Sequence, residues 1–187
     1  GIDFNTPKLN IEKIRTWKES IIKKLETGIK QLAKARKVQI INGTASFISP
    51  NKLQVTFNKI NQIISFDNCI IATGSTASKI SNFPKEDKKI IYSASALDLQ
   101  NIPKTMLIIG GGYIGLEMGT VYNALGTDIT IVEFMSSLLP NIDNDLVKPL
   151  SKKLNNNFKQ IILSTKVTQI DNNNNDITVH FESKEGK

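Results

Sequence analysis

A glycine-rich run followed by an acidic residue could bind a dinucleotide. The run comprises Gly110, Gly111, Gly112, Tyr113, Ile114 and Gly115, and the acid is Glu133. In the pattern G-x-G-x-x-G, the first glycine permits a tight turn, the second lets a pyrophosphate approach the backbone, and the third lets a helix pack on a strand. The start of that helix offers N–H groups to phosphate. Because strands flank the run, we favour a dinucleotide site over the alternative of a structural glycine turn.

Glu133 is expected to select NAD over NADP. A carboxylate at the end of the second strand can accept hydrogen bonds from both hydroxyls of the adenosine ribose, and it repels a 2′-phosphate. No Arg or Lys lies between Phe134 and Val147 to hold such a phosphate. The alternative is a solvated acid at a strand end. We therefore expect NAD as a cofactor.

Four other residues have chemically relevant side chains. Glu117 is either a carboxylate near the nicotinamide or an acid that favours a helix N-terminus. Tyr113 either covers the nicotinamide site or packs ordinarily. The only cysteine and the only histidine, Cys69 and His180, are expected to be a buried strand residue and an outward strand residue. We therefore expect no catalytic residue and no metal site in this chain.

Hydrophobic patterns predict the elements that position these residues. Residues 106–109 read as a buried strand, residues 113–125 as a helix and residues 128–132 as a strand, which together make a βαβ unit. The elements expected after it are a helix at 143–156, a strand at 160–163 and a hairpin of 166–171 with 177–182.

The part before the βαβ unit combines a helix with short strands. Apolar residues at three- and four-residue steps predict a helix over 9–37. Shorter runs predict strands at 38–41, 53–57, 62–66 and 69–72, the last buried on both faces. Residues 76–104 read as loop with a helical turn near 94–99.

Composition indicates a soluble globular protein. The chain has 187 residues, of which 40% are hydrophobic and 22% charged, and a net charge of +7. The basic excess lies in residues 8–37 and is interpreted as the solvated face of a helix, so no nucleic-acid partner is expected. No apolar run is long enough for a membrane span, and the N-terminus does not read as a signal peptide. We expect a cytoplasmic protein.

The sequence resembles the dihydrolipoamide dehydrogenases, FAD-containing members of the pyridine nucleotide–disulfide oxidoreductases. The similar segments are Lys13–Lys18, Asn42–Phe47, Ile71–Ser75, Ile109–Gly119, Leu139–Asp143 and Ser164–Val167. The second of these is read as a turn. The third and fourth, in this order and spacing, are specific to the wider group.

The resemblance implies an α/β, Rossmann-like FAD/NAD(P)-binding fold with three ββα layers. Residues 1–80 would be part of an FAD-binding domain, and residues 81–187 an NAD-binding domain truncated at its C-terminus. The implied NAD contacts are Gly110, Gly111, Gly112, Tyr113, Ile114, Gly115, Glu117, Glu133 and Val167. The implied FAD contacts are Ala45, Thr73, Gly74 and Ser75.

The resemblance also implies an activity and partners. The parent enzyme would oxidise dihydrolipoamide with NAD+ through a redox disulfide and FAD, as a homodimer within 2-oxo acid dehydrogenase complexes. The redox cysteine pair and the acid/base histidine of the family have no counterpart here, so we expect a central fragment that is inactive alone. A related flavin disulfide reductase and a stand-alone NAD-binding module remain as alternatives.

Overall fold

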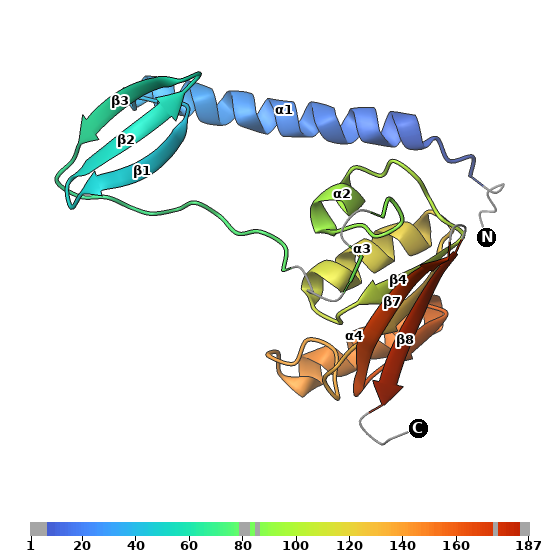
Figure 1. Cartoon of the computed structure of the whole chain (residues 1–187). Helices are drawn as coiled ribbons and strands as arrows, with labels where there is room; N and C mark the ends of the chain where they lie inside the picture. Colours follow the sequence, from blue (N-terminus) through green and yellow to red (C-terminus); the bar gives the residue numbers. More distant parts are fainter. Residues whose placement is uncertain (1–6, 79–82, 85–86, 174–175, 184–187) are drawn as a thin grey trace. The chain divides into compact units, whose positions relative to one another are not determined.

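The computed structural model describes residues 7–78, 83–84, 87–173 and 176–183 (Figure 1). These residues form two compact units: Glu12–Thr76, and a unit that joins the residues up to Ile11 with those from Ala77 onward. Among them, no helix is long and apolar enough to cross a membrane.

The first unit contains one long helix. The helix α1 spans Ile11–Ala35, close to the predicted range, and it carries no buried residue. Its apolar stripe is exposed: the side chains of Trp17, Leu25 and Ile29 are 67%, 63% and 69% accessible. The periodicity therefore predicted the helix correctly, although the apolar face is covered by nothing within the described unit.

An antiparallel meander makes up the rest of the regular structure in this unit. It consists of β1 (Thr44–Ser49), β2 (Lys52–Phe57) and β3 (Ile60–Ser65), in the order β1-β2-β3. Asn58 and Lys59 have positive φ angles of 49° and 67°, as a two-residue type I′ hairpin requires.

Two predicted strands of this unit are wrong. Residues 38–41 and 69–72 have no regular secondary structure, whereas residues 44–47, read as part of a turn, belong to β1. A strand needs a neighbour to satisfy its backbone N–H and C=O groups. Neither segment pairs with a strand among the described residues. Consequently Ile70 is 92% accessible, and Cys69 is exposed rather than buried.

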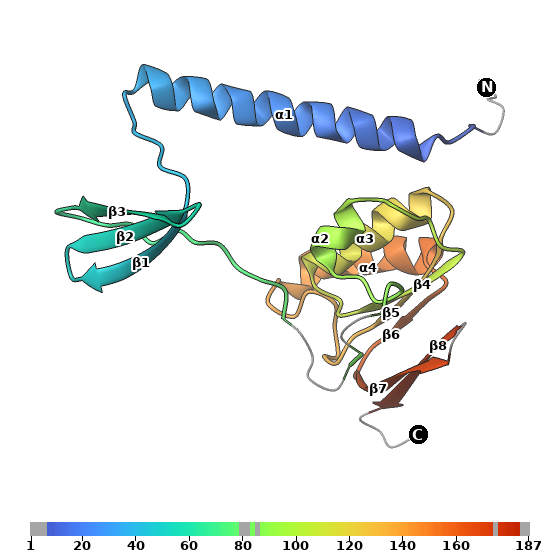
Figure 2. The same ribbon diagram turned by 45° about the horizontal axis from the view of Figure 1, so that its top comes forward.

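The second unit has three layers, which Figure 2 shows edge-on: helices, a parallel sheet and a hairpin. The sheet has the order β4-β5-β6, and the hairpin pairs β7 with β8. This arrangement confirms the expected three-layer ββα fold. The elements are α2 (Ser93–Leu97), β4 (Thr105–Ile109), α3 (Tyr113–Ala124), β5 (Asp128–Val132), α4 (Asn144–Asn157), β6 (Gln160–Ile162), β7 (Thr165–Asn173) and β8 (Asp176–Ser183).

The core of this unit is built around the central strand β5. Ile129 and Ile131 are wholly inaccessible, and the Tyr122 side chain of α3 is 1% exposed. The Tyr122 hydroxyl donates to the Ala96 carbonyl at 2.8 Å, which ties α2 to α3, and burial, followed by the charge of Asp98, raises the pKa of Tyr122.

The strand β4 is less buried than the sequence predicted. It is half-buried, with Ile109 41% exposed. Because β4 lies at the edge of the described three-stranded sheet, one of its sides has no neighbouring strand.

Candidate functional site

The glycine loop and Glu133 lie together at the carboxyl edge of the parallel sheet. The loop follows β4, and Glu133 follows β5, the strand paired with it in parallel. The Gly110 N–H donates to the Val132 carbonyl at 2.9 Å, which continues the ladder into the loop. Gly110 has a φ angle of +108°, a conformation that favours glycine. Ligands of open α/β sheets bind at this edge.

The two later glycines differ in what surrounds them. At Gly115, an added Cβ would lie 2.5 Å from the Gly110 carbonyl oxygen and 3.1 Å from Ile108 Cγ2, so α3 packs against β4 too closely for any side chain. At Gly112, which caps the N-terminus of α3, an added Cβ would meet nothing within 4 Å. The loop is therefore closed toward the sheet and open in front of the helix start, where a phosphate would be held.

Glu133 anchors the loop through its carboxylate. The side chain is buried at 8% exposure. Its Oε2 accepts from the Gly111 N–H at 2.6 Å, and its Oε1 accepts from the Met135 N–H at 2.6 Å. A carboxylate has about four lone-pair positions, so two stay available for ribose hydroxyls. The sequence pointed to Glu133 as a ribose acceptor but gave no sign of its hold on the loop.

Sequence reasoning missed Leu138, which contacts the glycine loop. Leu138 is 2% exposed, and its Cδ2 would lie 2.5 Å from a Cβ placed on Gly111. The next residue, Leu139, donates its N–H to the Gly111 carbonyl at 3.1 Å. These residues lie between β5 and α4, outside any periodic element. Leu139 begins the family-like segment Leu139–Asp143, but the sequence indicated no role at the loop for either residue.

The remaining predicted NAD residues lie on α3 and β7. Tyr113 and Ile114, at the start of α3, are 68% and 45% exposed, and Glu117 is exposed one turn further along. Val167 is half-buried on β7 and pairs with Phe181.

The backbone of Glu133 places the start of β7 beside the site. The Glu133 N–H donates to the Ile162 carbonyl at 2.8 Å, and the Glu133 carbonyl accepts from the Thr165 N–H at 2.9 Å. Every NAD residue that the sequence proposed therefore lies within the second unit.

The predicted FAD residues belong to the other unit. Ala45 lies on β1, an edge strand of the described meander, and is exposed. Thr73, Gly74 and Ser75 lie in an exposed segment without regular secondary structure, in which Gly74 has a φ angle of +75°.

Two further features carry polar side chains. His180 is exposed on β8, as expected, and its Nε2 lies 2.8 Å from Asp171 Oδ2. Hydrogen bonds from Gln169 and then from His180 lower the pKa of Asp171. Within the described ranges, no three His, Cys, Asp or Glu residues gather where they could hold a metal ion.

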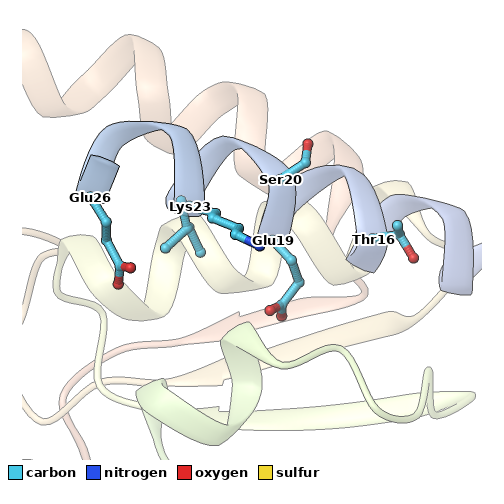
Figure 3. Close-up of a pocket in the computed structure, with 6 residues that line it drawn as sticks. Thr16, Glu19, Ser20, Lys23 and Glu26 are labelled. Atoms are coloured by element: carbon cyan, nitrogen blue, oxygen red, sulfur yellow. The ribbon is translucent and has the colours of Figure 1, made fainter. Parts of the chain in front are cut away.

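A hollow also follows one side of α1 (Figure 3). The Thr16 hydroxyl donates to the Glu12 carbonyl and the Ser20 hydroxyl to the Trp17 carbonyl, at 2.9 and 2.7 Å. These hydroxyls are thus used within the helix. The lining residues all come from α1: Thr16, Glu19, Ser20, Ile22, Lys23 and Glu26.

Comparison with known proteins shows what the chain is similar to. The chain matches the family described as pyridine nucleotide-disulphide oxidoreductase over residues 4–187. It is 42% identical over 184 residues to a dihydrolipoyl dehydrogenase of Vibrio cholerae, and 43% identical over 180 residues to one of Buchnera aphidicola from Schizaphis graminum. These alignments cover 98% and 96% of the chain but 38% of each relative.

Solved structures share the fold. The chain superposes on the Cu(II) complex of RclA, an HOCl-induced flavoprotein disulfide reductase from Escherichia coli, with a TM-score of 0.79 and 27% identity. That match covers 90% of this chain and 38% of the RclA chain. LpdA from Mycobacterium tuberculosis gives a TM-score of 0.84 at 18% identity, over 97% of this chain and 40% of that one, and supports the fold alone.

Proposed function

The chain belongs to the pyridine nucleotide-disulphide oxidoreductase family, and we propose that it is the NAD-binding part of a dihydrolipoyl dehydrogenase. It spans 38% of the length of the Vibrio cholerae enzyme. The proposal is supported by 42% identity to that enzyme and by the site at the carboxyl edge of the sheet.

The observation that carries the NAD assignment is the buried Glu133 carboxylate beside the glycine loop. With two N–H groups bound to it, the carboxylate is held in place before any ligand arrives. The adenosine ribose hydroxyls would donate to its free lone pairs, and the pyrophosphate would meet the N–H groups of the first turn of α3. A 2′-phosphate would meet a fixed negative charge and no cation between Phe134 and Val147.

The first unit is proposed to contribute to FAD binding. The residues proposed for this role are Ala45, Thr73, Gly74 and Ser75, and the support for them is the resemblance of Asn42–Phe47 and Ile71–Ser75 to the family. Their exposure leaves them accessible to a ligand. The proposed domains are therefore residues 1–80 for FAD and residues 81–187 for NAD.

The whole enzyme would oxidise the two thiols of dihydrolipoamide to a disulfide and reduce NAD+ to NADH with release of a proton. FAD would carry the electron pair between a redox disulfide and the nicotinamide. The enzyme would act as a cytoplasmic homodimer within 2-oxo acid dehydrogenase complexes. This chain supplies the dinucleotide site and no catalytic residue.

A related flavoprotein disulfide reductase is the second candidate, which the likeness to RclA supports. It shares the proposed cofactors and differs in the substrate that is oxidised. The higher identity to dihydrolipoyl dehydrogenases, 42% against 27%, favours the first candidate.

Calorimetric titration with NADH and NADPH tests the NAD assignment. We expect the chain to bind NADH in preference to NADPH. Glu133→Gln should weaken NADH binding by about tenfold or more, since a lost hydrogen bond to a charged group is worth roughly 1.5–3 kcal/mol. Glu133→Gln should also reduce the preference for NADH over NADPH, because the charge that repels the 2′-phosphate is gone.

The matched control is Glu182→Gln, the same substitution at an exposed position of β8. It should bind NADH like the unchanged chain. The assignment would be contradicted if the unchanged chain bound NADH and NADPH equally. It would also be contradicted if Glu133→Gln and Glu182→Gln lost the same amount of NADH affinity.

A further inference from the structure

Gly111 is held on three sides, through its N–H, its carbonyl and the space beside its Cα. Its N–H donates to Glu133 Oε2, and its carbonyl accepts from the Leu139 N–H. On the third side the Leu138 side chain fills the space that a Cβ would take. At Gly110 and Gly112 an added Cβ would meet nothing within 4 Å. The middle glycine is therefore the residue at which the loop is fixed to the segment between β5 and α4.

Leu139 is held in an unfavourable backbone conformation to make this contact. Its φ angle is +47°, in the left-handed region where a side chain crowds the following carbonyl. Its N–H is used by Gly111, and its own carbonyl accepts from the Ile142 N–H at 2.9 Å. Such conformations persist where the surrounding contacts over-determine them, and they cluster at ligand sites.

We propose that Leu138 and Leu139 are positioning residues for the dinucleotide: they hold the glycine loop, through Gly111, in the conformation that receives the pyrophosphate. This inference rests on the proposed NAD site and adds to it two residues outside the glycine motif. Leu138 acts by filling space against Gly111, and Leu139 by its backbone N–H. Neither needs to touch the ligand.

The arrangement predicts a specific pattern of NADH affinities. Leu138→Ala should lower the affinity about tenfold if the loop then spends about a tenth of its time in the competent conformation. Leu154→Ala is the matched control, because Leu154 is the same residue type, 3% exposed and in α4 of the same unit. It should destabilise the fold similarly, since truncations of buried leucines share one physical cause. It should change NADH affinity less than twofold, because Leu154 lies in α4 and not in the segment that contacts Gly111.

A pair of variants that adds a side chain at Gly111 and shortens the one at Leu138 separates a positioning role from general damage to the fold. Gly111→Ala places a Cβ against Leu138 and should weaken NADH binding. The φ angle of Gly111 is not positive, so the backbone tolerates alanine at this position. Combined with Leu138→Ala, which vacates that space, the double variant should bind NADH more tightly than Gly111→Ala alone. Two independent losses would instead add.

The results distinguish failure of the proposed function from failure of the positioning role. If the unchanged chain does not bind NADH, the proposed function fails, and the inference fails with it. If the unchanged chain binds NADH but Leu138→Ala and Leu154→Ala bind equally well, only the positioning role is overturned. Should Leu138→Ala not fold, Leu138→Val and Leu154→Val give the same comparison with a smaller change.

Discussion

The two units differ in how much of their apolar surface they bury. In Glu12–Thr76, Val55 is the only buried hydrophobic residue described. In the unit from Ala77 onward, α3, β5, α4 and β7 all contribute buried residues. Both stretches carry clear hydrophobic patterns in their sequences. A hydrophobic pattern therefore does not ensure burial, which depends on whether the elements that cover it lie in the same stretch of chain.

The largest expected effect comes from truncating the same residue type in the two units. Ile131→Ala on β5, where the side chain is 0% exposed, should lower the free energy of unfolding by about 2–5 kcal/mol. Ile63→Ala on β3, where the side chain is 60% exposed, should change it by less than about 0.5 kcal/mol. Urea unfolding followed by circular dichroism measures both.

Equal losses of unfolding free energy in Ile131→Ala and Ile63→Ala would contradict the difference in burial between the two units. They would mean that the meander buries Ile63 against a surface that its own unit does not provide. A larger loss at Ile131 would confirm that the parallel sheet carries the core that this chain can form from its own residues.

The glycine loop also contains one closely packed position and one open position, for which we expect a smaller difference in the free energy of unfolding. Gly115→Ala must displace the Gly110 carbonyl or Ile108, and overpacking of this kind costs about 1–3 kcal/mol. Gly112→Ala points into open space and should cost less than about 1 kcal/mol, the usual scale for a helix N-cap. Both should weaken NADH binding, Gly112→Ala by occupying the space of the pyrophosphate.

Thermal melting and NADH titration of the two variants separate the roles. Gly115→Ala is expected to lower the melting temperature and the affinity together, whereas Gly112→Ala should lower mainly the affinity. If Gly112→Ala bound NADH normally, the open face of the loop would not be where the pyrophosphate lies.

The sequence predicted the second unit better because its signals are local. The βαβ unit is continuous in sequence, each strand is followed by a turn or helix start, and Gly115 marks where α3 packs on β4. The prediction at 69–72 failed for the opposite reason. An apolar run reads as a buried strand only if a partner strand exists, and none is described for it.

The missed parts of the candidate site are contacts between distant residues. The hydrogen bond from Gly111 to Glu133 and the packing of Leu138 on Gly111 join two loops that follow different strands. Neither residue type nor spacing reveals such a contact, because it depends on the pairing of β4 with β5. Glu133 was found by its place at a strand end, while Leu138 had no comparable signal.

The smallest expected effect concerns Asp171, in the exposed hairpin layer of the second unit. Gln169 Nε2 donates to its Oδ1 at 2.5 Å, and His180 Nε2 lies 2.8 Å from its Oδ2. The hydrogen bond from Gln169, first, and that from His180 lower the pKa of Asp171 from its ordinary value of 3.8.

A lowered carboxyl pKa in the folded state means that these contacts stabilise the hairpin above the unfolded pKa and cease to do so as the pH falls through the lowered value. Because the Asp171 side chain is 37% accessible, solvent screens the contacts and the gain is small. A carbon-detected NMR titration should show the pKa of Asp171 rising toward 3.8 in Gln169→Ala. An identical pKa in both proteins would remove Gln169 as the main cause and would leave the contact of His180 with Asp171 Oδ2 to account for the lowered pKa.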